Sequence, residues 1–204
     1  MKVISPIYDW AYALTPRKQT THLILHHAGE SIASAEGIHA YHKSLGWAGI
    51  AYHYLVRKDG SVYAGRPIGM MGGHTKDWNY CSVGVCFEGN FNKEYMTDRQ
   101  LEAGQELISE ICAKYPGIIV GQHKDYNATA CPGENFPFAL LISPDDEGSV
   151  ENDEGTPSDW AKSACDWAVE KGIFKGDGSG NFRWHDNVTR EELAVLLMRL
   201  EGEA

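Results

Sequence analysis

A histidine and a cysteine lie close together in one short segment of the sequence, where they could bind a metal ion. His123 and Cys131 stand in the segment GQHKDYNATACPG at 121–133, and two histidines, His26 and His27, end an apolar run far upstream. Zinc binds imidazole nitrogen and thiolate sulfur, and a hydrolytic zinc site uses three protein ligands with water in the fourth position. These residues therefore predict a zinc-dependent hydrolase whose third ligand comes from the histidine pair.

The apolar run LILHH at 23–27 predicts a β-strand that carries this pair. Successive side chains of a strand point to opposite faces of its sheet, so only one of His26 and His27 can face the metal. A histidine taken alone is more often packed or solvated than metal-bound. The prediction therefore depends on the whole set, whose members lie at the ends of apolar segments, where side chains leave a rigid sheet.

Further motifs follow one another in order along residues 15–141. They are LHHA at 25–28, IHAYH at 38–42, GWAGIAYHY at 46–54, GH at 73–74, CSVGVCFEG at 81–89 and the segment from Gln122 to Pro132. With these motifs the chain resembles the zinc-dependent N-acetylmuramoyl-L-alanine amidases of the second type, which include phage endolysins and animal peptidoglycan-recognition proteins. The resemblance implies the α/β fold of that family, with a central mixed β-sheet flanked by helices.

The resemblance also implies roles for individual residues. The expected Zn²⁺ ligands are His26, His123 and Cys131, the expected catalytic residues are Tyr52 and Thr129, and the expected substrate-binding residues are His27, Trp47, His53 and His74. The implied reaction cleaves the amide between the N-acetylmuramoyl group and L-alanine of the stem peptide by zinc-activated water. Tyrosine and threonine hydroxyls suit it, because both can donate hydrogen bonds to a developing oxyanion.

The chain departs from parts of this family at two positions. Some phage relatives carry lysine in place of Thr129, and threonine supplies no fixed charge, so stabilisation of the transition state is expected to depend more on zinc and Tyr52. Another branch uses a carboxylate general base where this chain has Cys86. The tyrosine branch fits better, and Glu88, two residues later, is a minor candidate for the base.

Helices and strands alternate in a way that favours an α/β domain. The patterns predict strands at 23–27, 82–87 and 118–120, a hairpin of 52–57 and 61–64, and helices at 34–45 and 97–115. Thr97 is expected to begin the second long helix in a capping box with Gln100. The short strand at 118–120 would deliver His123, so that both metal-bearing elements are anchored in the sheet.

The composition changes after the amidase-like region and predicts three parts: a catalytic domain at 1–142, an acidic linker at 143–157 and a small helical module at 158–204. The linker is rich in Asp, Glu, Gly and Pro and contains no lysine or arginine, a composition that cannot bury enough apolar surface to fold. The module resembles one surface-layer homology repeat, most specifically in TREE at 189–192. That resemblance implies binding to a secondary cell-wall polymer, and a single repeat with so little core is expected to self-associate or to pack on the enzyme.

Charge and composition exclude several classes of protein. The net charge of −10 argues against a nucleic-acid partner, and the absence of an apolar run of bilayer length predicts no membrane span. The five cysteines show no spacing typical of a disulfide framework. The first residues lack the apolar core of a signal peptide. We therefore expect synthesis in a host cytoplasm, without a signal peptide, and action at the bacterial cell wall.

The motifs together predict a peptidoglycan hydrolase, an endolysin of a phage that infects a Gram-positive host. The alternatives are a bacterial autolysin and a peptidoglycan-binding module without catalysis. A third is a cysteine hydrolase in which Cys131 attacks and His123 is the base, which would require a depressed thiol pKa. Removal of metal separates this last class, because a cysteine nucleophile survives chelation.

Overall fold

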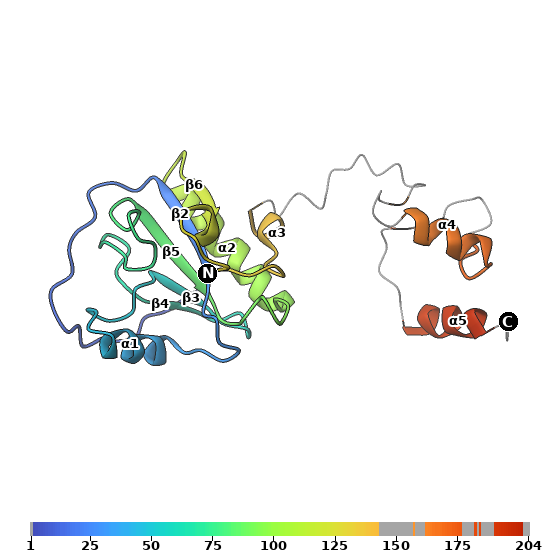
Figure 1. The fold of residues 1–204 in the computed structure, drawn as a ribbon, viewed down its shortest axis with the longest axis horizontal. Coiled ribbons are helices and arrows are strands. Elements are labelled where there is room, and N and C mark those ends of the chain that lie inside the picture. Colours follow the sequence, from blue (N-terminus) through green and yellow to red (C-terminus); the bar gives the residue numbers. More distant parts are fainter. Residues whose placement is uncertain are drawn as a thin grey trace. The chain divides into compact units, whose positions relative to one another are not determined.

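A mixed sheet of six strands forms the centre of the N-terminal part of the chain (Figure 1). The strands are β1 (Val3–Ile4), β2 (His22–His27), β3 (Tyr54–Val56), β4 (Val62–Ala64), β5 (Ser82–Phe87) and β6 (Ile119–Gln122), and they lie in the order β1-β4-β3-β5-β2-β6. The hairpin of β3 and β4 is antiparallel, and the other neighbours pair in parallel. The predicted mixed α/β architecture is confirmed.

The computed structural model describes residues 2–142, 157, 162–176, 182, 184 and 190–201. The chain divides into two units between Glu147 and Gly148. The acidic linker predicted at 143–157 lies outside the described residues apart from Pro157, so its boundaries stay a prediction. Among the helices of the described segments, none combines the length and the apolar character needed to cross a bilayer.

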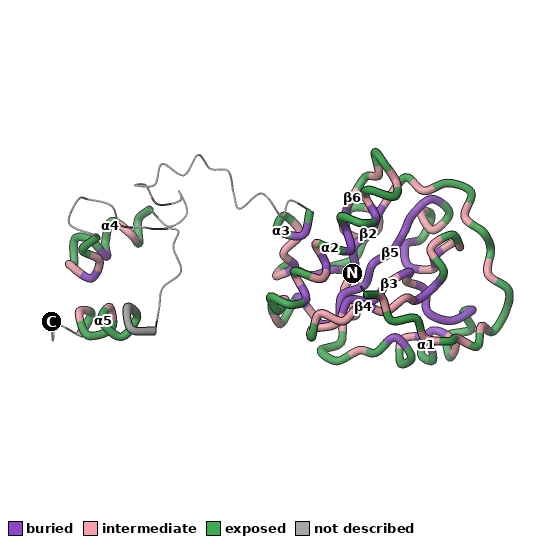
Figure 2. Tube along the Cα trace, turned by 180° about the vertical axis from the view of Figure 1, so that it is seen from behind, coloured by how far each residue is buried: buried purple, intermediate pink, exposed green. Residues whose placement is uncertain are grey.

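The two long helices of the first unit cover opposite faces of the sheet. Helix α2 (Asp98–Lys114) packs Leu107, Ile108 and Ile111 against a cluster that includes side chains of β2 and β5. Helix α1 (Ala35–Ser44) contributes to a second cluster, which contains Cys86. Figure 2 shows β2 and β5 largely buried, as expected for strands covered on both faces.

Both helices begin at the predicted residues, with one difference in the second. Ser34 accepts a hydrogen bond from the Gly37 N–H, and Thr97 accepts one from the Gln100 N–H at 3.3 Å. The Gln100 side chain does not complete the predicted capping box. It is fully buried and donates instead to the carbonyls of Val56 and Glu88, at 3.0 and 2.9 Å, because buried backbone acceptors need partners.

Two short helical segments follow β6: the 3₁₀ turn η1 (His123–Asp125) and α3 (Phe138–Ile142). Neither was predicted from the sequence. The turn η1 directly follows the strand that was expected to deliver His123. Helix α3 contributes Leu141, which is fully buried in the cluster beneath α2.

The second unit contains α4 (Lys162–Glu170) and α5 (Arg190–Glu201), in agreement with a small helical module. The Arg199 guanidinium donates a hydrogen bond to the Ile173 carbonyl at 2.9 Å and so links α5 to the segment after α4. Several large apolar side chains of these helices are exposed, namely Trp167, Val169, Leu193, Val195, Leu197, Met198 and Leu200. The side chains of the predicted motif at 189–192 lie outside the described residues.

Candidate metal centre

Strand β2 holds His26 at its carboxyl end, on the face of the sheet that α1 covers. His26 pairs in register with Cys86 of β5, and parallel partners in register share a face. The side chain is 1% exposed. A residue fixed by a strand between two neighbouring strands has little freedom, which suits a ligand that must hold its position.

Strand β6 brings His123 beside His26. The pairing of β2 with β6 ends at Leu25 and Gln122, so the next residue of each strand continues toward the same end of the sheet. The imidazole rings of His26 and His123 lie 4.5 Å apart between centroids. The Asn127 amide oxygen lies 3.2 Å from Nε2 of His123, a contact that can orient the ring.

The loop after η1 carries Cys131 back to β2. The Cys131 carbonyl accepts a hydrogen bond from the Lys124 N–H at 2.9 Å, and its Sγ accepts one from the His27 N–H at 3.4 Å. Sγ lies 3.8 Å from Nδ1 of His26. The ligand atoms of His26, His123 and Cys131 all lie within 4.8 Å of one another, so the three predicted ligands form one cluster.

The chemistry and spacing of this cluster fit zinc. Two imidazole nitrogens and one sulfur, with no carboxylate among them, are a typical donor set for zinc. Ligands at zinc bond lengths in a tetrahedron lie roughly 3.5 Å apart. The 3.8 Å between Sγ of Cys131 and Nδ1 of His26 is close to that value.

Burial sets the protonation of these groups in the metal-free protein. Burial, and then the neighbouring imidazoles, lower the pKa of His26 well below its ordinary value. Burial also lowers the pKa of His123, against a smaller raising effect of the Asn127 hydrogen bond. Both rings are therefore neutral at pH 7, with lone pairs available to a cation. Burial raises the pKa of Cys131 to about 11, so binding a metal would release its thiol proton.

His27 points to the other face of the sheet, as the alternation along β2 predicts. Its Nδ1 accepts a hydrogen bond from the Phe91 N–H at 3.2 Å, and its ring stacks on that of Phe91 at 6.3 Å between centroids. Phe91 belongs to the core cluster beneath α2. The expected contact of His27 with substrate stays a prediction.

The two residues expected to be catalytic both lie beside the cluster, Tyr52 near His26 and Thr129 near Cys131. The Tyr52 ring is 5.2 Å from that of His26 between centroids. Burial, and then Cys86 and Cys131, raise the pKa of Tyr52 well above its ordinary value, so the hydroxyl keeps its proton. Thr129 is exposed, and its Oγ1 accepts a hydrogen bond from the Cys131 N–H at 3.2 Å. The Thr129 hydroxyl proton therefore remains available for donation.

The remaining predicted substrate residues differ in their burial. Trp47 is 41% exposed and lies over the ring of His42 at 4.8 Å between centroids. His53 is 1% exposed, its Nδ1 accepts from the Gly84 N–H at 2.9 Å, and its Nε2 lies 2.9 Å from the Met70 carbonyl. These contacts make His53 part of the interior, while Trp47 presents a surface to solvent.

His74 contacts a predicted metal ligand directly. Its Nδ1 lies 2.9 Å from Nε2 of His26, and it is 7% exposed. Sequence reasoning named His74 but missed its partners Thr75 and Ser82, as well as Asn127 beside His123. Asn127 could have been found from its position four residues after His123. Ser82 lies in β5, and nothing in the sequence indicates its contact with His74.

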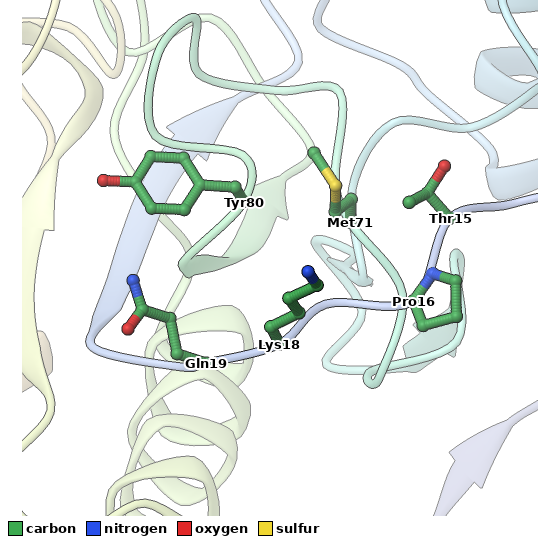
Figure 3. Close-up of a pocket in the computed structure, with 6 residues that line it drawn as sticks. All are labelled: Thr15, Pro16, Lys18, Gln19, Met71 and Tyr80. Carbon is green, nitrogen blue, oxygen red and sulfur yellow. The ribbon is translucent and has the colours of Figure 1, made fainter.

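A separate pocket of about 440 Å³ lies near the amino ends of β2 and β5 (Figure 3). It is lined by Thr15, Pro16, Lys18, Gln19, Met71 and Tyr80. His26 lies at the opposite end of β2, and the residues expected to be catalytic or metal-binding do not line this pocket. It is therefore distinct from the candidate metal centre.

Two family models match the chain in separate segments. The model described as N-acetylmuramoyl-L-alanine amidase matches residues 16–134, and the model described as S-layer homology domain matches residues 154–194. The first match contains the complete cluster of His26, His123 and Cys131. The second overlaps the predicted C-terminal module.

Individual relatives agree with the first match. Peptidoglycan-recognition protein SC2 of Drosophila melanogaster is 35% identical over 128 residues, which are 57% of this chain and 70% of the relative. An endolysin of Klebsiella phage KP32 is 32% identical over 126 residues, 58% of this chain and 83% of the relative. A solved structure of the N-acetylmuramoyl-L-alanine amidase LysC from Clostridium intestinale aligns with a TM-score of 0.69 and 35% identity, covering 72% of this chain and 98% of that one.

The opposite orientations of two adjacent histidines give a direct test of the cluster. We expect His26→Ala to reduce bound zinc from about one ion per chain to near zero, because only two protein ligands remain. His27→Ala should keep its zinc, since only contacts with Phe91 are lost. Metal content of the purified variants, measured by atomic emission, separates the two. Equal loss from both variants would contradict the assignment of faces.

Proposed function

Since the chain belongs to the N-acetylmuramoyl-L-alanine amidase family, we propose that it hydrolyses the amide between N-acetylmuramoyl and L-alanine of the stem peptide, with a zinc ion held by His26, His123 and Cys131. The observation that carries this proposal is the convergence of two imidazoles and one thiol within 4.8 Å, from two segments of the matched region that lie far apart in the sequence. Peptidoglycan is the substrate polymer of this family, so the site of action is the cell wall.

The division of labour among the chain's own residues follows from their positions. When bound, zinc supplies Lewis-acid polarisation of the amide carbonyl and lowers the pKa of water. Tyr52 keeps its proton and can donate a hydrogen bond to the oxyanion that develops beside His26. Thr129, whose Oγ1 accepts a hydrogen bond from the Cys131 N–H, can donate a hydrogen bond through its hydroxyl group from the solvent side. Neither residue adds a fixed charge.

We propose that substrate contacts extend from this centre toward solvent. Trp47 offers an exposed aromatic face that suits the apolar face of a sugar ring or of a peptide side chain. His27 and His74 would act from beside the metal ligands, and His53 from the interior behind them. Trp47 is the one of the four that is accessible enough for extended contact with a polymer.

Replacing one hydroxyl tests the role of Tyr52. We expect Tyr52→Phe to lower kcat by about 100-fold, the cost of removing one donor to an oxyanion. The partly buried ring and its packing against His26 remain, so bound zinc should not change. Hydrolysis of a muramoyl-peptide, followed together with zinc content, gives both values. A variant with wild-type kcat would remove Tyr52 from the mechanism.

Metal removal tests the proposal as a whole. We expect purified protein to contain about one zinc per chain and to release peptides with new L-alanine amino termini from purified wall. Chelation should abolish that release, and added zinc should restore it. Bound zinc without any release of amino termini would instead support a peptidoglycan-binding module without catalysis.

The cysteine hydrolase is the less favoured alternative. A nucleophilic cysteine needs a depressed pKa, whereas burial raises the pKa of Cys131 to about 11. Its Sγ lies 3.8 Å from Nδ1 of His26, whereas the predicted base was His123. Activity that survives chelation would reverse this preference.

The biological setting that we propose is lysis by a phage of a Gram-positive host, with a bacterial autolysin as the alternative. An endolysin of a Klebsiella phage and a Clostridium amidase are among the similar proteins, which supports the lytic setting. The S-layer homology match supports a Gram-positive host, because such domains bind secondary cell-wall polymers. The exposed apolar residues of α5 also support self-association through this unit.

Removing the second unit tests its contribution to wall binding. A chain ending at Glu147 keeps every residue of the candidate site, and the amidase match at 16–134 lies wholly within that first unit. We expect the shortened chain to sediment less with purified walls than the full chain, and to be monomeric in analytical ultracentrifugation. Its hydrolysis of a small soluble muramoyl-peptide should be unchanged. Equal wall retention by both chains would remove the targeting role.

A further inference from the structure

A chain of buried polar groups leads from the candidate metal centre into the interior. Nε2 of His26 lies 2.9 Å from Nδ1 of His74. Nε2 of His74 lies 3.5 Å from Oγ of Ser82, and that hydroxyl donates to the Trp78 carbonyl at 2.7 Å. The three side chains of this relay, His26, His74 and Ser82, are 1%, 7% and 0% exposed.

The last member of the relay fixes the direction of every hydrogen bond in it. A carbonyl can only accept, so the Ser82 hydroxyl uses its proton on Trp78 and offers a lone pair to His74. Nε2 of His74 is then the donor, and its Nδ1 is an acceptor. His26 must accordingly carry its proton on Nε2, which leaves the lone pair of Nδ1 directed toward Sγ of Cys131 at 3.8 Å.

The backbone reserves space for the His74 ring. A Cβ atom at Gly84 would lie 2.5 Å from ring atoms of His74, and one at Gly72 would lie 2.4 Å from them. Both distances are shorter than any ordinary contact, so any larger residue at either position would displace the imidazole. Gly84 belongs to β5, which places this space in the sheet itself.

Thr75 offers His26 a second, weaker partner. Its Oγ1 lies 3.3 Å from Nε2 of His26 and 2.9 Å from Nδ1 of His74. It can therefore accept from the same N–H of His26, at a longer distance than His74. A hydroxyl can also donate, so the tautomer of His26 is set by the contact with His74 and not by the contact with Thr75.

From this geometry we propose that His74 is a positioning residue: it holds His26 as the Nε2-protonated tautomer, so that Nδ1 is the atom presented to the metal. The inference rests on the proposed zinc site. A histidine ligand with both nitrogens free to exchange the proton presents the correct lone pair only part of the time. A fixed acceptor on the far nitrogen removes that loss and also fixes the rotation of the ring.

Three variants of the full chain test the proposal. His74→Phe fills the same space without an acceptor, whereas His74→Asn keeps an oxygen near the position of Nδ1. Thr75→Val is the matched control, because it removes the longer contact and keeps the shape of the side chain. We expect zinc affinity, measured by competition with a chromophoric chelator, to fall about 10- to 100-fold in His74→Phe. The falls in His74→Asn and Thr75→Val should be several-fold at most.

The tautomer itself can be measured without zinc. Long-range ¹H–¹⁵N correlation spectra of the zinc-free protein distinguish the protonated nitrogen of each neutral imidazole. We expect His26 to carry its proton on Nε2 in the wild type and in His74→Asn, and to populate both tautomers in His74→Phe. If His74→Phe does not fold, Ser82→Ala serves in its place, because loss of the hydroxyl should allow both tautomers of His74.

The outcomes separate this inference from the proposed function. A wild-type chain that binds no zinc contradicts the proposed function, while the spectra still decide the tautomer of His26. Unchanged zinc affinity and an unchanged His26 tautomer in His74→Phe would overturn the positioning role. So would a Thr75→Val variant that loses as much affinity as His74→Phe. Weaker zinc binding in His74→Phe, with recovery in His74→Asn, supports the role.

Discussion

The candidate site depends on the parallel pairing of β2 with both β5 and β6. That pairing sets His26 opposite Cys86 on one side and ends at Gln122 on the other, one residue before His123. A slip of one residue would turn His26 to the α2 face, and Leu23 and Leu25 would leave the core there. The burial of Leu23 and Leu25 beneath α2 therefore fixes the orientation of the metal ligand as well as the core.

Histidines are numerous on the α1 face, and the main chain occupies most of their nitrogens. Nδ1 of His39 accepts from the Ile50 N–H, Nδ1 of His42 from the Ala51 N–H, and Nδ1 of His53 from the Gly84 N–H. A buried polar ring needs such partners, because its desolvation is otherwise uncompensated. His26 differs from these three because its Nδ1 faces Sγ of Cys131, at 3.8 Å, rather than a backbone N–H. Hydrogen bonding thus distinguishes the candidate ligand from histidines that support the fold.

Five of the six strands of the sheet, all except β1, and the two long helices could be predicted from local patterns in the sequence, and the resemblance of its motifs to a known family implied the three-residue cluster. Alternation in LILHH placed one histidine on each face, and Ser34 and Thr97 marked the helix starts. The side chain of Gln100 could not be predicted, because its partners are carbonyls of β3 and of the segment after β5. The contact between His74 and His26 was hidden for the same reason. It joins positions 48 residues apart and depends on space left by Gly84 in β5 and by Gly72.

Burial decreases from one side of the candidate site to the other. This gradient bears on both the rigidity of the site and its access to substrate. His26 and His74 are almost fully buried, His123 and Cys131 are half-buried, and Thr129 is exposed. A cross-linked polymer cannot enter a closed cavity, so its hydrolysis needs reacting atoms that are reachable from one side. The buried side, in contrast, must hold ligand geometry without help from substrate. An arrangement with His26 fixed in a strand and Thr129 in an exposed loop meets both needs, because the sheet holds the buried side of the site while the loop of Thr129 faces solvent.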